Sequence, residues 1–462
     1  MELLTVLAAL IFLMTVAYKG YSVILFAPVA ALGAVFFTDP SQVAPMFTSV
    51  FMVKMVDFIK LYFPVFLLGA IFGKVIELSG FSKAIVASVI KLIGRQRAML
   101  SIVLVCALLT YGGVSLFVVV FAVYPFAAEL FRVGNIPKRL IPGTIALGAF
   151  SFTMDALPGT PQIQNIIPTT FFGTNTWAAP WLGVFGAIFV FILGMTYLEW
   201  CRRRAEAAGE GYGTNLLNEP EHVDTGSLPN AWIAVLPLLM VGLGNLYFTG
   251  AIPEWYGKSH TLVLGNGQEV VTDVSKVVAI WAVEAALLLG ILTVMVFAGK
   301  VVMQRFAEGS KTAVAGALLA SLNTASEYGF GAVIAALPGF LYVAHALSSI
   351  PNPLLNEAIT VTSLAGITGS ASGGLSIALA AMSQQFIQAA HAAGIPLEVF
   401  ARVASMASGG MDTLPHNGAV ITLLAVTGLS HRQSYKDIFA ITVLKTSAVF
   451  FVIAVYYVTG IV

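Results

Sequence analysis

Two aspartates stand inside long apolar stretches of this chain, each within the same short pattern. Asp155 lies in "MDALPGTPQ" (154–162), and Asp412 lies in "MDTLPHNGA" (411–419). An ionisable side chain in a membrane-embedded segment is costly and by default marks a functional site. His416 follows Asp412 by four residues, and histidine titrates near neutral pH. The second pattern therefore favours proton coupling, for which Asp155, Asp412 and His416 are the candidates.

Helix-breaking residues interrupt both stretches, so unwound backbone would accompany each aspartate. They are Pro158, Pro161, Pro168, Pro415 and Gly418. Unwound backbone can offer carbonyl and N–H groups to a ligand. The side chains predicted to bind a substrate there are Thr160, Gln162, Asn165, Thr413 and Asn417. The alternative is that the aspartates only cap helix ends and that His416 is a satisfied buried histidine.

Two further apolar stretches are interrupted by glycine and serine. The interrupting residues predicted to bind substrate are Gly112, Gly113, Ser115, Ser372, Gly373, Gly374 and Ser376. A half-helix that starts at such a tip directs free N–H groups and a positive dipole end toward an anion. A substrate carboxylate would suit both tips. Alternatively, the glycines only allow helices to pack closely.

Glu327, in "NTASEYGFG" (323–331), is a third acidic candidate. Its counterpart in the repeat described below is Gly69, so this acid belongs to one half of the chain only. An asymmetric buried acid suits a proton carrier or a group that selects the substrate. It could equally form a structural pair with Arg402.

The composition requires a membrane to hold these residues. The chain has 462 residues, of which 58% are hydrophobic and 10% charged, whereas soluble domains carry about 25% charged residues. We therefore expect an all-α integral membrane protein. The formal net charge of +1 gives no reason to expect nucleic acid binding. The two cysteines have neither metal nor disulfide spacing, and no cofactor is expected.

A spanning helix needs about 20 apolar residues, which predicts about ten transmembrane helices and two re-entrant hairpins. Unbroken spans are expected near 2–18, 21–38, 59–79, 180–200, 229–250, 276–299, 313–347 and 436–460. Broken helices are expected at about 138–171 and 396–429, and the re-entrant hairpins at about 98–131 and 355–391. Residues 41–57 suggest an interfacial helix, and a small β-hairpin is expected around Gly265-Asn266-Gly267.

Four short matches recur in the same order at offsets of 257 to 261 residues. They are "LLGAIFGKVIELSGF" with "ASEYGFGAVIAALPGF", "GGVSL" with "GGLSI", "GNIP" with "AGIP", and "MDALP" with "MDTLP". This predicts a first repeat at 1–200, a polar linker at 201–228 and a second repeat at 229–462. Five spans per repeat is an odd number, so the second copy is inverted. Interrupted segments at matching positions of inverted halves indicate a secondary transporter with a binding site near the bilayer midplane.

Basic residues give the expected orientation. With the Arg202-Arg203-Arg204 loop in the cytoplasm, most other basic loop residues also fall inside, and only Lys54, Lys60, Lys258 and Lys276 fall outside. The linker would then be cytoplasmic, and both termini would lie on the non-cytoplasmic side.

The segments "SFTMDALPGTPQIQNIIPTTFFG" (151–173) and "GGMDTLPHNGAV" (409–420), with the Gly-Gly-x-Ser tips, resemble the gluconate permease (GntP) family of the ion transporter superfamily. The resemblance covers nearly the whole chain and is strongest to permeases of short hydroxy acids such as 3-hydroxybutyrate. It implies a proton-coupled symporter of a small organic anion in a bacterial inner membrane. It also implies a dimerising scaffold and a transport domain that moves as an elevator.

The alternatives concern substrate, coupling ion and class of protein. The order Asp412, Pro415, His416, Asn417 departs from the Asn-Asp pair near a histidine expected of the sugar-acid members. Gluconate or a citrate-like substrate is therefore the second choice, and sodium is the alternative coupling ion. An intramembrane aspartyl enzyme is a remote alternative, because it would require Asp155 and Asp412 to lie within hydrogen-bonding distance. We expect no enzymatic activity.

Overall fold

The computed structural model describes residues 2–19, 21–94, 97–214, 216–220, 228–340, 342, 350–415 and 417–462. Its first half contains α1 (Glu2–Tyr18), α2 (Val23–Thr38), η1 (Pro40–Gln42), α3 (Val43–Met46), η2 (Phe47–Phe51), α4 (Met52–Leu78), α5 (Phe81–Ile93), α6 (Ala98–Tyr111), α7 (Leu116–Val133), α8 (Leu140–Ala149), α9 (Phe152–Asp155), α10 (Ile163–Phe172) and α11 (Pro180–Ala207). Its second half contains α12 (Ala231–Tyr256), β1 (Ser259–Val263), β2 (Glu269–Asp273), α13 (Val274–Met303), α14 (Phe306–Ala336), α16 (Pro353–Thr368), α17 (Ala371–Ala393), α18 (Leu397–Gly409), η4 (Gly410–Thr413), α19 (Gly418–Thr427) and α20 (His431–Thr459).

The protein is mostly helical and has several apolar segments of membrane-spanning length. Among the described residues, five helices are long and apolar enough to cross a bilayer: Pro40–Leu78, Pro180–Ala207, Ala231–Tyr256, Val274–Met303 and His431–Thr459. Other apolar helices are shorter, including α1 and α2 with 17 and 16 residues. The number of crossings expected from the sequence, about ten, therefore stays a prediction.

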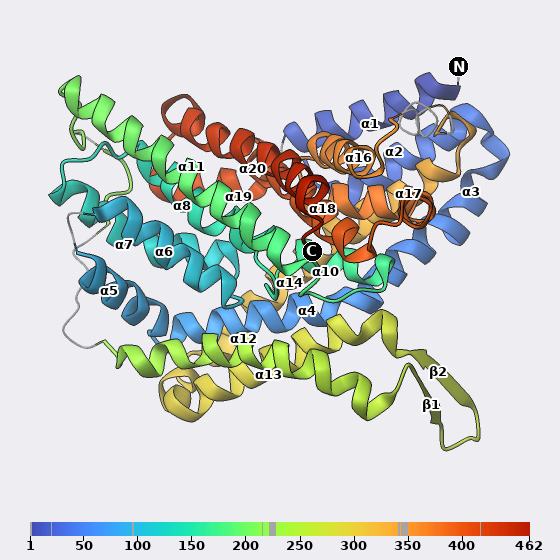
Figure 1. Cartoon of the computed structure of the whole chain (residues 1–462), viewed down its shortest axis with the longest axis horizontal. Coiled ribbons are helices and arrows are strands. Elements are labelled where there is room, and N and C mark those ends of the chain that lie inside the picture. The colour runs from blue at the N-terminus through green and yellow to red at the C-terminus, as the bar shows by residue number, and fades with distance from the viewer. Residues whose placement is uncertain are drawn as a thin grey trace.

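One group of helices is built around the pair α4 and α14, which pack along each other. α13 packs on α4, α2 packs on α14, and α12 and α13 lie side by side along one edge of the molecule (Figure 1). Residues 41–57, expected to form an interfacial helix, are helical and belong to one run from Pro40 to Leu78 that includes α4. β1 and β2 form the expected hairpin, with antiparallel register from Ser259↔Asp273 to Val263↔Glu269, and project beyond α12 and α13 (Figure 1).

A second group contains the two helix hairpins and the two interrupted helices. α6 and α7 are joined at 112–115, and α16 and α17 are joined at 369–370. The chain unwinds between α9 and α10, and again between η4 and α19. α10 packs against α17 and α18, α19 packs against α7 and α8, and α11 packs on α20. Pro168, expected to break the first helix, lies inside α10, which continues through it.

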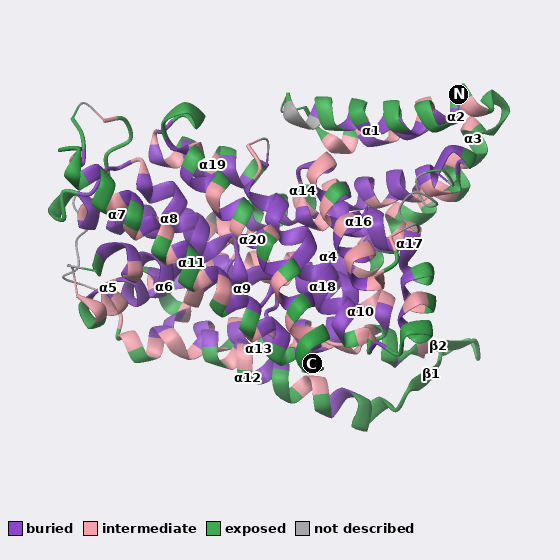
Figure 2. Cartoon of the chain, turned by 45° about the horizontal axis from the view of Figure 1, so that its top comes forward, coloured by how far each residue is buried: buried purple, intermediate pink, exposed green. Residues whose placement is uncertain are grey.

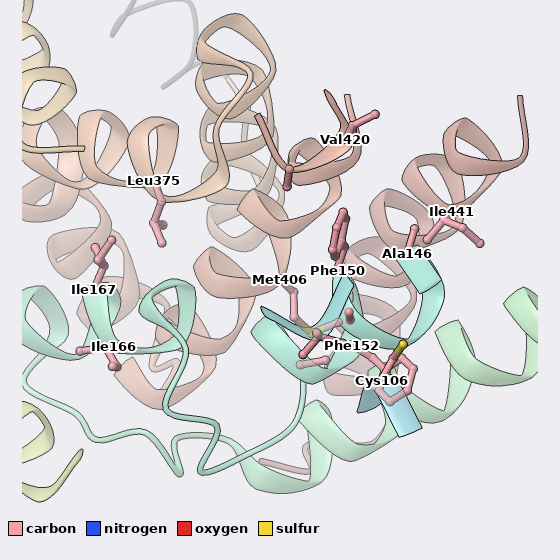
Figure 3. Close-up of a cluster of buried hydrophobic side chains, with 14 of the residues drawn as sticks. Cys106, Ala146, Phe150, Phe152, Ile166, Ile167, Leu375, Met406, Val420 and Ile441 are labelled. Atoms are coloured by element: carbon pink, nitrogen blue, oxygen red, sulfur yellow. The ribbon is translucent and has the colours of Figure 1, made fainter. Parts of the chain in front are cut away.

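Buried residues run through the middle of the bundle, and much of the outer surface of α1 and the β-hairpin is exposed (Figure 2). One part of the core contains Cys106, Phe150, Phe152 and Met406, which come from different segments of the chain (Figure 3). Gly148 lets α8 approach α6, because a Cβ there would lie 2.5 Å from Cβ of Cys106. This close packing fixes the positions of the interrupted segments.

Candidate functional site

The connection between α16 and α17 is a tight, self-capped tip. Gly369 adopts a left-handed conformation (φ +69°) and ends α16, with its N–H bonded to the carbonyl of Ala365. Ser370 then caps α17, since its side chain accepts a hydrogen bond of 3.1 Å from the N–H of Gly373. Glycine tolerates the positive φ that this reversal requires. The first turn of the 23-residue α17 therefore begins inside the protein.

The carboxylate of Asp412 lies at this helix start. Its Oδ1 accepts a hydrogen bond of 3.0 Å from the N–H of Ala371, and its Oδ2 accepts one of 2.7 Å from Nε2 of Gln164. Asn417 donates from Nδ2 to Oδ1 at 3.3 Å and to the carbonyl of Gly369 at 2.9 Å. Asp412 is 7% exposed. One acid thus joins the second hairpin tip to both interrupted helices.

Glu327 lies on α14, which packs against α17. Its side chain reaches the first turn of α17. A Cβ added to Gly373 would lie 1.7 Å from Oε2 of Glu327, so the carboxyl group rests directly on the backbone of α17. Oε2 is buried without a hydrogen-bond partner among the described residues. Nearby, the hydroxyl groups of Thr324 and Ser372 lie 3.3 Å apart. Two buried acids, Asp412 and Glu327, therefore flank the start of α17.

Other residues of the second tip serve its structure. Gly374 lets the two arms of the hairpin meet, because a Cβ there would lie 2.0 Å from Cα of Ala365. The hydroxyl of Ser376 donates to the carbonyl of Ser372 at 2.7 Å. Thr413 bonds the hydroxyl of Thr442 at 2.7 Å, which ties η4 to α20. Their predicted contact with a substrate stays a prediction.

The tip of the first hairpin packs against apolar side chains. A Cβ on Gly112 would lie 2.6 Å from Leu238 of α12, and one on Gly113, where φ is +93°, would lie 3.2 Å from Leu287 of α13. The backbone N of Ser115 faces α4, 3.6 Å from a Cβ placed on Gly73. The two tips thus differ in their described contacts, because two acids, Asp412 and Glu327, lie against the second.

The first interrupted segment is held by hydrogen bonds within the fold. Thr160 donates to the carbonyl of Thr153 at 2.7 Å, and Asn165 donates to the carbonyls of Thr160 and Thr176. Gln162 donates to the carbonyl of Thr110 at 2.8 Å, which joins this segment to the first hairpin. Substrate contact by these three predicted residues stays a prediction.

Arg402 fastens the same segment from α18. It is 1% exposed, and its guanidinium donates to the carbonyls of Asp155, Thr176 and Ala178 and to Oδ1 of Asn165. The possible pair between Glu327 and Arg402 is therefore not formed.

Asp155 has a basic partner. The ammonium of Lys445, on α20, lies 3.0 Å from Oδ2 of Asp155, and both side chains are buried. Asp155 thus bonds a cation, whereas Asp412 bonds neutral donors. The described residues also contain no group of three or more histidine, cysteine or acidic side chains that could hold a metal.

His416 lies outside the described residues, so its predicted proton role stays a prediction. Three residues at the site lay outside the predicted set: Gln164, Lys445 and Arg402. Their signal in the sequence is the same as that of the aspartates, a polar or charged side chain within an apolar stretch. Gln164 adjoins the predicted Asn165, and only the fold reveals that it, and not Gln162, reaches Asp412.

Comparison with known proteins supplies the class of protein. No protein-family model matches the chain. It is 58% identical, over 472 aligned positions that cover all of both chains, to a Bacillus subtilis (strain 168) protein named "Uncharacterized transporter YxjC". Among solved structures, the YdaH transporter of Alcanivorax borkumensis matches with a TM-score of 0.48 and 14% identity, over 91% of this chain and 90% of that one. On the full-length identity to YxjC, the chain belongs to the YxjC family of bacterial membrane transporters.

Proposed function

We propose that this transporter is a secondary carrier that takes up a small organic anion together with protons. The substrate class favoured by the family resemblance is a short hydroxy-monocarboxylate such as 3-hydroxybutyrate. The observation that carries the proposal is the pair of buried acids at the start of α17, where Asp412 accepts a hydrogen bond from Ala371 and Glu327 rests on Gly373.

The coupling follows from competition for the same donors. The N–H of Ala371 and the amide of Gln164 now bind a carboxylate that belongs to the protein. Protonation of Asp412 removes its charge and weakens both bonds, because charge-assisted hydrogen bonds are about twice as strong as neutral ones. The released donors, at the positive end of α17, then receive the carboxylate of the substrate. Protonation of Asp412 thus favours substrate binding, which couples the two ligands.

Glu327 is the second buried acid of this scheme. A buried carboxylate without a partner is much more costly than the neutral acid, and Oε2 has no partner among the described residues. Symport of a monoanion with one proton needs one proton-carrying residue. We therefore assign one of the two acids as the proton carrier and the other as a group that responds to its protonation. In this scheme Asp412 is the carrier, because it alone bonds the donors that the substrate needs.

The architecture proposed for this cycle is two inverted repeats. It is supported by close contacts between corresponding helices of the two halves: a Cβ on Gly73 of α4 would lie 3.5 Å from Val118 of α7, and one on Gly331 of α14 would lie 2.9 Å from Ile377 of α17. Helices α4, α12, α13 and α14 form the scaffold, which dimerises, and the hairpins with the interrupted helices move as an elevator. The linker lies in the cytoplasm and both termini outside the inner membrane.

Uptake into proteoliposomes tests the proposal. Purified protein is reconstituted and given labelled 3-hydroxybutyrate under an inward proton gradient, an inward sodium gradient, or neither, with lactate, gluconate and citrate as competitors. We expect accumulation with the proton gradient alone and competition by lactate. Accumulation driven only by sodium would overturn the coupling, and competition by gluconate or citrate alone would overturn the substrate class.

A further inference from the structure

The ammonium group of Lys445 occupies a position between the two interrupted helices. It donates to the carbonyl of Phe150, at the end of α8, over 2.7 Å, and to the carbonyl of Gly409, at the end of α18. The third oxygen is Oδ2 of Asp155, 3.0 Å away. The side chain of Lys445 is 2% exposed. One buried positive charge therefore joins the first interrupted helix, the second interrupted helix and α20.

These three oxygens are the ligands of a hard cation. Carbonyls at the C-terminal ends of half-helices carry the negative end of the helix dipole, and such carbonyls coordinate sodium in transporters with interrupted helices. Carboxylate and carbonyl oxygens also make up the sites of Ca²⁺ and Mg²⁺. Here a side chain supplies the cation.

We propose that Lys445 is a tethered cation that fills a sodium-type site between the interrupted helices. The protein thereby neutralises Asp155 permanently and transports without sodium. This inference rests on the proposed proton coupling, for which it gives a structural reason. It also assigns the residue that separates proton-coupled from sodium-coupled operation in this fold.

The second half of the site offers a comparison within the same molecule. Asp412, 257 positions after Asp155, accepts hydrogen bonds only from neutral groups among its described contacts. The positions 257 to 261 residues before Lys445 are 184–188, "VFGAI", which contain no basic residue. The direct ion pair thus belongs to Asp155, and the described hydrogen bonds of Asp412 leave it without a fixed cationic partner.

Removal of the lysine distinguishes a structural ion pair from a filled cation site. If Lys445 only stabilises the fold, Lys445→Ala leaves Asp155 unpaired, and all monovalent salts have the same small effect. If the lysine fills a cation site, the same substitution leaves two carbonyls and one carboxylate around a space that a sodium ion with water can occupy. Sodium then stabilises the variant specifically, since a ligand that binds only the folded state raises stability by mass action.

The test is thermal unfolding of the purified protein in detergent at constant ionic strength, with sodium, potassium or choline chloride. For Lys445→Ala we expect a saturable rise in Tm with sodium, about 2 °C at ten times Kd, and none with choline. The wild type should show no sodium-specific shift. The double variant Asp155→Asn with Lys445→Ala should also show none, because it lacks the carboxylate. Lys445→Gln, which retains much of the side-chain volume, is the second variant.

Three results would overturn the inference. They are a sodium-specific shift in the wild type, equal shifts with all three salts in Lys445→Ala, and failure of both single variants to fold at any sodium concentration. The readout is binding and not transport, so it is separate from the proposed function. If wild-type uptake did not depend on a proton gradient, proton coupling would be refuted. The expected shift in the Tm of Lys445→Ala with sodium would not change.

Discussion

Replacement of Asp412 by asparagine is the sharpest perturbation of the site. Asparagine has nearly the same shape but presents one oxygen and one NH₂ group. In either orientation, one of the two present donors, the N–H of Ala371 or Nε2 of Gln164, faces another donor. Each charge-assisted bond is worth about 1.5–3 kcal/mol and a neutral one about 1. The substitution should therefore weaken the contact between the hairpin tip and the interrupted helices by about 2–5 kcal/mol.

The transport result should separate binding from coupling. Because the neutral amide resembles protonated Asp412, we expect exchange of internal for external substrate to persist. Accumulation driven by a proton gradient should fall at least about tenfold, which corresponds to about 1.4 kcal/mol. The matched control is Asp57→Asn. Asp57 is half-exposed and lies 3.8 Å from Lys54, and such a surface pair contributes about 0–1 kcal/mol.

The assay is uptake of labelled substrate in proteoliposomes, with and without a proton gradient, beside Tm measurements on the same preparations. Wild-type accumulation by a folded Asp412→Asn protein would refute the reasoning. If the variant loses both exchange and accumulation while its Tm is unchanged, Asp412 binds substrate and does not carry the proton.

Three further predictions address the neighbouring contacts. Gly373→Ala should lower uptake, because its Cβ would lie 1.7 Å from Oε2 of Glu327 and would displace that carboxyl group from α17, whereas Gly316→Ala on α14, with nothing within 4 Å, should transport normally; parallel uptake assays compare them. Arg402→Lys should lower Tm by several degrees, because one ammonium group cannot replace guanidinium bonds to four acceptors; an unchanged Tm would contradict this. Burial alone would raise the pKa of Glu219, but its hydrogen bonds with Lys138 and Arg132 hold the pKa below its ordinary value. The stabilisation it gives is therefore complete above the unfolded-state pKa and lost as pH falls through the lower folded-state value. Between pH 3 and 7, the Tm of Glu219→Gln should therefore depend less on pH than the Tm of the wild type. The same dependence of Tm on pH in both proteins would show that the bonds of Glu219 to Lys138 and Arg132 do not hold the linker in place.

The sequence predicts those features of the fold that depend on local chemistry. Proline and glycine mark the interruption at 156–162, where the chain leaves the helix. The Gly-Asn-Gly sequence marks the turn between β1 and β2. By contrast, Pro168 sits within α10, because a proline is tolerated in a buried helix when neighbouring groups satisfy the freed carbonyl.

The candidate site depends on contacts that span hundreds of residues, which local patterns do not specify. A charged residue in an apolar stretch identifies Asp412, but its partner Gln164 lies 248 residues away. Thr160 and Asn165 are equally polar, and the fold directs their hydrogen bonds to nearby backbone and to Arg402. Sequence polarity thus finds the region, and packing decides which side chain serves structure and which faces the start of α17.

Proton coupling can be measured as proton movement driven by the substrate. Proteoliposomes that contain a trapped pH-sensitive dye receive an inward gradient of 3-hydroxybutyrate in sodium-free buffer. Protein-free vesicles and the Asp412→Asn variant control for passive entry of the neutral acid. We expect the lumen of wild-type vesicles to acidify faster than that of both controls, at a rate that saturates with substrate. Substrate entry without such acidification, or acidification that requires sodium, would contradict proton-coupled transport by this protein.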